Sequence, residues 1–201
     1  MTVLIALKDK KGIHLASDSQ GTWGNKILHR RNTSKFISKK IKINDGYGET
    51  IKENTIHIGV TGYAFLNEYL QYGLDLPPME ENKKFEEYLS RTLLPKIMKK
   101  LTENKLVEID NSEVDTKSLF MIIYNGQIYT INRNLSFGII EDEYASFGSG
   151  SEVALGVLYA TKNTKLNGYE RCKLAIKACD YHTVYVDGHM KYKYVPKKNK
   201  P

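Results

Sequence analysis

The residues best suited to chemistry stand at the start of the chain, where Thr2 follows Met1. Removal of Met1 would expose Thr2 as the first residue, with its hydroxyl beside a free α-amine. An α-amine has a pKa of about 8, so part of it is unprotonated near neutral pH and can accept the hydroxyl proton. Thr2 could then act as both nucleophile and base. The alternative is that Met-Thr is simply how the chain starts.

A carboxylate is predicted to lie beside Thr2. Residues 3–7 have the pattern of a buried strand, residues 8–12 that of a turn, and residues 13–17 that of the returning strand of a hairpin. Because a hairpin brings its two ends together, Asp18 would return alongside Thr2. This places an acidic group next to the latent amine.

Two junctions between a strand and a helix supply further candidate groups. Residues 55–60 alternate like a strand, and a helical pattern starts at Ala64, with Gly62 between them. Free backbone N–H groups at such a junction suit an oxyanion or another anion, although many plain turns are built the same way. At the second junction, Ser149 and Glu152 have the spacing of a capping box, which predicts Ser149 as a helix cap.

The elements between these residues indicate the fold. Residues 19–25 are predicted to form a loop and residues 35–43 a strand, whereas residues 85–101 are helical with a kink or break at Pro95. The remaining patterns predict a hairpin at Asn125-Gly126, strands at 135–140 and 144–147, a helix over 169–179, and closing strands at 184–186 and 192–195. The order of strands, two helices, strands, two helices and strands predicts an α+β fold, a four-layer αββα sandwich. We expect one domain over residues 1–195 and a disordered basic tail over 196–201.

The composition limits the partners. The 201 residues have a net charge of +7, but much of the excess lies in residues 26–42 and 191–200, without the interleaved aromatic residues that bind single strands. Nucleic acid is therefore not a favoured partner.

No apolar run is long enough for a membrane span, and the first residues lack the pattern of a secretion signal. Cys172 and Cys179 lie two helical turns apart, too far for a disulfide, and read as core residues of a reduced, cytoplasmic protein. The spacing of cysteines and histidines predicts no metal site, and no cofactor is expected.

These features together resemble the proteasome β-subunit family of N-terminal-nucleophile hydrolases, most of all the bacterial proteasome-like threonine peptidases. The resemblance covers most of the chain and is carried by Met1-Thr2-Val3, by residues 15–25 (Leu-Ala-Ser-Asp-Ser-Gln-Gly-Thr-Trp-Gly-Asn), by residues 58–62 (Ile-Gly-Val-Thr-Gly) and by residues 147–151 (Phe-Gly-Ser-Gly-Ser). It implies an αββα fold with the threonine at the mouth of the sandwich.

The resemblance also implies roles for single residues. Thr2 matches the nucleophile, Asp18 the family's aspartate, Gly62 the oxyanion donor, and Ser149 a serine near the threonine amine. Thr22 matches a residue that pairs with the substrate backbone, and Val60 and Ala64 match the lining of a pocket for the side chain before the cut. The family's lysine is assigned to Lys35, because a one-residue loop insertion disturbs the fold least, with Lys39 or Lys40 as the alternative.

The departures from the family pattern keep other functions open. Tyr63 replaces the usual second glycine, and Asp180 and Thr183 stand where the family has a second aspartate and a serine. The leading hypothesis is a threonine endopeptidase in a homo-oligomeric ring that cuts peptides or unfolded proteins, with an ATP-dependent unfoldase as an implied partner. The alternatives are a non-catalytic shell subunit of a proteasome-like particle, and an N-terminal-nucleophile amidase that acts on small molecules.

Overall fold

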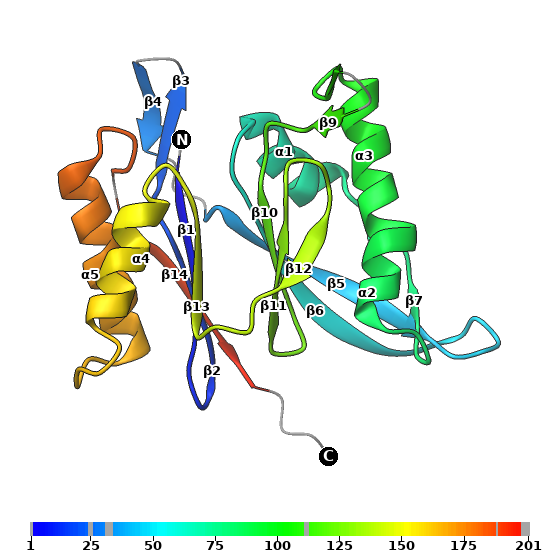
Figure 1. The fold of residues 1–201 in the computed structure, drawn as a ribbon. Coiled ribbons are helices and arrows are strands. Elements are labelled where there is room, and N and C mark those ends of the chain that lie inside the picture. The colour runs from blue at the N-terminus through cyan, green and yellow to red at the C-terminus, as the bar shows by residue number, and fades with distance from the viewer. Residues whose placement is uncertain (1, 24–25, 31–33, 111–112, 188, 198–201) are drawn as a thin grey trace.

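The computed structural model describes residues 2–23, 26–30, 34–110, 113–187 and 189–197, and the side chains of residues 22–30, 109, 110 and 113 lie outside that description. Two sheets lie face to face, with helices on both outer faces (Figure 1). The predicted four-layer αββα sandwich is confirmed.

The first sheet contains the strand that carries Thr2. Its order is β13-β1-β2-β14, and it consists of β1 (Val3–Lys8), β2 (Gly12–Ser17), β13 (Tyr144–Gly148) and β14 (Lys191–Pro196), all antiparallel to their neighbours. Its outer face is covered by α4 (Ser151–Ala160) and α5 (Gly168–His182). The predicted hairpin of residues 3–17 is confirmed.

The second sheet has the order β12-β11-β10-β6-β5-β7. Its strands are β5 (Phe36–Asn44), β6 (Thr50–Val60), β7 (Met79–Glu80), β10 (Phe120–Tyr124), β11 (Gln127–Ile131) and β12 (Phe137–Ile139). All pairings are antiparallel except the short one between β5 and β7.

Helices α1 (Ala64–Glu68), α2 (Phe85–Tyr88) and α3 (Leu94–Glu103) cover the outer face of this second sheet. π-helical segments follow α1 at Tyr69–Gly73 and α2 at Leu89–Leu93. Pro95 lies in the first turn of α3, directly after the second of these segments, so the predicted helical stretch is divided there.

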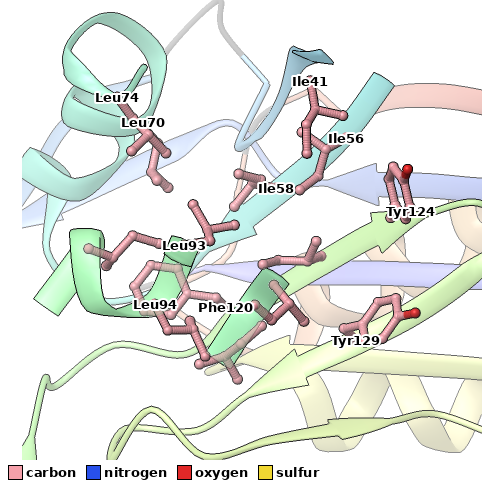
Figure 2. Packing of buried hydrophobic residues seen from close by; sticks show 14 of the residues in the cluster. Ile41, Ile56, Ile58, Leu70, Leu74, Leu93, Leu94, Phe120, Tyr124 and Tyr129 are labelled. Atoms are coloured by element: carbon pink, nitrogen blue, oxygen red, sulfur yellow. The ribbon is translucent and has the colours of Figure 1, made fainter. Parts of the chain in front are cut away.

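The strand β1 is buried on both faces, which explains its unbroken apolar sequence. Val3, Ile5 and Leu7 pack against α4 and α5, whereas Leu4 and Ala6 lie in the core between the sheets. The third core lies between the second sheet and α1 to α3, where Ile41, Ile56, Ile58 and Phe120 meet Leu70, Leu93 and Leu94 (Figure 2). This packing makes β1 a rigid support for Thr2, which directly precedes it.

Two predicted segments differ in the structure. Residues 19–25 were expected to be a loop, but Gln20–Trp23 forms β3, paired with β4 (Lys26–Arg30) in a two-stranded ribbon. Residues 184–186 were expected to be a strand but form a turn and coil, and the strand that pairs with β2 on the side away from β1 is β14. Val186 uses its branched side chain for packing in the core beneath α5 instead.

A second two-stranded ribbon is formed by β8 (Glu108–Asp110) and β9 (Glu113–Asp115), which the sequence patterns did not indicate. At the other end of the chain, β14 ends at Pro196 and the Lys197 N–H donates to the Lys11 carbonyl over 2.7 Å. Residues 198–201 of the predicted basic tail lie outside the described residues. None of the described helices is long and apolar enough to span a membrane.

Candidate active site

Thr2 lies immediately before β1 and is almost fully buried, with 4% of its surface exposed. Its hydroxyl donates a hydrogen bond of 2.7 Å to Asp18 Oδ1. The register of the hairpin sets up this contact, because Leu4 pairs with Ser17, which places Val3 opposite Asp18 and Thr2 directly next to it. The predicted approach of Asp18 to Thr2 is what the structure shows.

Asp18 is the centre of the hydrogen-bond network. Its Oδ1 also accepts from the Val3 N–H at 2.9 Å and from Lys35 Nζ at 2.7 Å, and its Oδ2 accepts from the Gln20 N–H at 3.1 Å. The carboxylate is completely buried, and the Lys35 side chain is 12% exposed. A buried charge is tolerated when it is paired and hydrogen-bonded, so this network holds Asp18 in one position.

The three candidate lysines have different surroundings. Lys35 precedes β5, and its ammonium group forms the ion pair with Asp18. Lys39 instead donates to the Leu74 carbonyl at 2.7 Å, and Lys40 is exposed on β5. Of the three, the structure brings Lys35 to the oxygen that also binds the Thr2 hydroxyl.

Ser149 faces Thr2 rather than a helix end. Its hydroxyl lies 3.3 Å from the Thr2 nitrogen, from which it accepts, and 3.3 Å from the Thr2 carbonyl oxygen. The N-cap of α4 is Gly150, and no side chain caps that end. The predicted capping box at Ser149 is therefore wrong, because the helix begins two residues later and the hydroxyl is turned to β1. A capping box does occur at Asn167 and Glu170 of α5.

Gly148 is a site residue that the sequence patterns did not single out. It lies at the end of β13 opposite Val3 and has a φ of +101°, in the range that favours glycine. A Cβ at this position would stand 2.1 Å from the Thr2 carbonyl oxygen and 2.9 Å from Thr2 Cγ2. The Gly-Ser-Gly sequence was the available signal, because it permits close approach of two backbones.

Gly62 follows β6 on the neighbouring sheet and also has a φ of +101°. Phe36 pairs with Gly59, so the end of β6 lies beside the start of β5, which Lys35 precedes. Within the described part of the chain, no hydrogen bond of the Gly62 N–H is found. Gly62 is itself exposed.

The predicted substrate-binding residues differ in burial and in position. Val60 is buried in the core against α1 to α3, whereas Ala64 is exposed at the first position of α1. Thr22 lies in β3 next to an irregularity in the pairing with β4, but its side chain is outside the described residues.

The residues that match the family's second aspartate and serine lie near the end of α5. Asp180 is exposed, and Thr183 is the C-cap, with a buried hydroxyl that has no hydrogen-bond partner in the described chain. One turn earlier, the Cys179 thiol donates to the Gly150 carbonyl. Burial, with a smaller effect of the Asp18 carboxylate, raises the pKa of Cys179 to about 11. The thiol therefore stays protonated and unreactive, and Cys179 serves as a packing residue behind the site. Cys172 and Cys179 are both free.

This arrangement can support nucleophilic catalysis. A threonine hydroxyl shares a carboxylate oxygen with a lysine ammonium, which favours the negative charge that develops on a deprotonated hydroxyl. Among the described residues, no group of three His, Cys, Asp or Glu side chains could hold a metal ion.

Comparisons with known proteins agree with this fold. No family model matches the chain. A proteasome subunit β of Methanobrevibacter smithii is 26% identical over 178 residues, which cover 88% of this chain and 76% of that protein. A proteasome subunit β 1 of Thermococcus onnurineus is also 26% identical, over 88% of this chain and 78% of its own length.

Solved structures extend the likeness to the whole chain. BPH of Thiobacillus denitrificans in complex with epoxomicin superposes with a TM-score of 0.75 at 17% identity, covering 99% of this chain and 100% of that one. The eukaryotic HslV of Trypanosoma brucei gives a TM-score of 0.61 at 13% identity, over 96% and 99% of the two chains.

The fold is that of the proteasome-like proteins with which the chain superposes. The chain is similar in sequence to proteasome β subunits, and the resemblance seen in its sequence is confirmed.

Proposed function

We propose that this chain is a threonine endopeptidase of a proteasome-like, self-compartmentalised particle, with Thr2 as the nucleophile after removal of Met1. The observation that carries the proposal is the contact of the Thr2 hydroxyl and the Lys35 ammonium with one oxygen of Asp18. The similarity to proteasome β subunits supports the same reading.

In the proposed reaction, Thr2 Oγ1 attacks the carbonyl carbon of a peptide bond. Its proton passes to the Thr2 α-amine, directly or through water, and then to the departing amine, which leaves an ester between Thr2 and the acyl fragment. Water hydrolyses this ester and restores the hydroxyl. No metal or cofactor takes part.

The other residues have separate parts in this reaction. Lys35 stabilises the deprotonated hydroxyl, and Asp18 orients both groups. The Gly62 N–H donates to the oxyanion, an interaction worth about 3 kcal/mol in the transition state. Ser149 lies within reach of the Thr2 nitrogen, so it orients the amine once the bond to Met1 is cut. Thr22 pairs with the substrate backbone, and the exposed Ala64 borders the pocket for the side chain before the cut, whereas Val60 is buried in the core.

We further propose a homo-oligomeric ring that encloses the site and receives unfolded protein, with an ATP-dependent unfoldase as partner. Assembly is supported by large apolar side chains that are exposed on α4, on α5 and directly after α5: Leu155, Tyr159, Leu174, Tyr181 and Val184. A monomeric protein rarely exposes so many apolar side chains on two adjacent helices. The two free, buried cysteines fit the reducing cytoplasm.

The mass of the native protein tests the mechanism directly. Loss of one methionine from the intact mass is required, because Thr2 has no free amine while Met1 remains. Native mass spectrometry of the same sample measures the ring. A monomer would favour the alternative of an amidase for small molecules.

A threonine-directed covalent inhibitor separates a protease from an inert shell subunit. Epoxomicin is the first choice, because the Thiobacillus protein binds it. We expect one adduct per chain, mapped to Thr2 by peptide sequencing. Absence of labelling in a preparation that has lost Met1 would support the non-catalytic shell.

A further inference from the structure

The loop before β10 packs directly against Gly62. Val60 pairs with Phe120, and the pairing continues past the strand ends, because the Thr61 N–H donates to the Leu119 carbonyl at 2.9 Å. The Leu119 N–H donates in return to Thr61 Oγ1 at 3.4 Å. The next residue on each side is therefore brought together, which sets Ser118 beside Gly62.

The contact between these two residues leaves no free space. A Cβ on Gly62 would stand 2.5 Å from Ser118 Oγ, 2.5 Å from the Lys117 carbonyl oxygen and 3.1 Å from Ser118 Cα. Ser118 is 1% exposed, and its hydroxyl has no hydrogen-bond partner in the described chain. A buried hydroxyl without a partner is costly, so hydrogen bonding does not explain this serine, whereas its contact with Gly62 does.

The turn that presents Ser118 is itself held from several sides. Lys117 has a φ of +50°, a conformation uncommon for a residue with a side chain, and its N–H donates to Asp115 Oδ1 at 2.8 Å. Thr116 Oγ1 donates to the Ser118 carbonyl at 3.1 Å, and Arg133 Nε donates to Asp115 Oδ1 at 2.7 Å. The turn is therefore a fixed wall behind Gly62.

We infer that Ser118 is a positioning residue that fixes the direction of the Gly62 N–H. This inference rests on the proposed function, in which that N–H binds the oxyanion. A glycine at positive φ has neighbouring conformations within easy reach, so its peptide group turns unless something blocks it. The Ser118 side chain and the Lys117 carbonyl pack against the Gly62 Cα, which restricts the conformations open to this glycine.

Two substitutions at Ser118 test the inference. Ser118→Ala removes the Oγ atom that contacts Gly62, and Ser118→Val replaces it with two methyl groups that crowd Gly62. We expect kcat for a peptide substrate to fall about tenfold in the first and about 100-fold in the second, with KM unchanged, because a displaced donor acts on the transition state. Ser146→Ala is the matched control, since Ser146 also has a buried hydroxyl without a partner in the described chain, and it should keep the wild-type kcat.

The amide signal of Gly62 gives a readout that does not depend on activity. In Ser118→Val we expect its 1H and 15N chemical shifts to move, because the orientation of the Gly62 peptide group changes, and we expect both to be unchanged in Ser146→Ala. An active wild type whose Ser118 variants keep both kcat and the Gly62 signal overturns the inference. A rise in KM with kcat unchanged does so as well. An inactive wild type refutes the proposed function instead, and the Gly62 signal still decides whether Ser118 positions this residue.

Discussion

The Thr2 carbonyl and Gly148 are in such close contact that no side chain could stand between them. A Cβ on Gly148 would lie 2.1 Å from the Thr2 carbonyl oxygen, and Gly148 has a φ of +101°. The Gly150 N–H donates to the same oxygen at 3.4 Å. The nucleophile is thus fixed from its backbone side by β13 and from its hydroxyl side by Asp18.

Gly148→Ala should therefore inactivate the protein and destabilise it by about 3 kcal/mol or more, because it combines backbone strain with overpacking. Urea denaturation and peptide hydrolysis measure the two effects. Gly156→Ala is the control: this position lies inside α4 with open space around it, and we expect it to be stabilised by about 0.5–1 kcal/mol. Equal stability of the two variants would contradict the packing argument.

Thr2→Ala should abolish peptide hydrolysis, a loss of at least about 1,000-fold, while circular dichroism and oligomeric mass stay as in the wild type. Thr2→Ser keeps a hydroxyl next to the amine and should retain measurable activity. Hydrolysis that persists in Thr2→Ala would show that another residue is the nucleophile.

The three lysines can be separated by one substitution each. Lys35→Met should lower kcat about 100-fold or more, because it removes the cation that shares an Asp18 oxygen with Thr2. Lys39→Met and Lys40→Met should retain kcat within about threefold, since Lys39 bonds to the Leu74 carbonyl and Lys40 is exposed. A larger loss in either of these than in Lys35→Met would reassign the lysine.

Asp18→Asn should destabilise the fold by about 3–5 kcal/mol, because Lys35 then keeps a nearly buried charge without its counterion. The double variant Asp18→Asn/Lys35→Met should recover part of that stability, since no charge is left unpaired. Chemical denaturation of the four proteins forms a double-mutant cycle. Strict additivity of the two losses would mean that the ion pair contributes no coupling.

His57 should make the protein less stable in mild acid. Burial, with a smaller effect of Lys193, lowers the pKa of His57 to about 4, below its ordinary value of 6.5. The unfolded chain therefore binds more protons between these two values, so stability is present above pH 6.5 and is lost as the pH falls toward 4, by about 3 kcal/mol at most.

Denaturation of the wild type and of His57→Asn at pH 7 and pH 4.5 measures this loss. The Asn oxygen can still accept from Ser38, which bonds His57 Nδ1 at 2.8 Å, but it does not titrate. The variant should lose less stability between the two pH values than the wild type. The same slope in both proteins would assign the acid sensitivity to other groups.

Much of the site could be predicted because its parts are local in the sequence. The apolar run of β1 and the turn after it determine a hairpin, and the hairpin register alone brings Asp18 to Thr2. Alternation along β6 and the onset of helix at Ala64 likewise place Gly62 at a junction. The order of strands and helices gave the four layers, because each amphipathic element has only one way to bury its apolar face.

The tertiary structure decided what depends on contacts between distant segments. The local pattern at Ser149 indicated a helix cap, and only the family resemblance implied a place near the Thr2 amine. The packing of β13 against β1 is what brings Ser149 to Thr2, 147 residues away. The choice of Lys35 over Lys39 likewise required the position of β5 relative to the first sheet, since all three candidate lysines have similar local patterns. Residues 184–186 have strand propensity, but β14 is the segment that pairs with β2 on the side away from β1, and Val186 packs in the core beneath α5 instead. Sequence patterns report what a segment prefers, whereas the packed chain determines which partner is available to it.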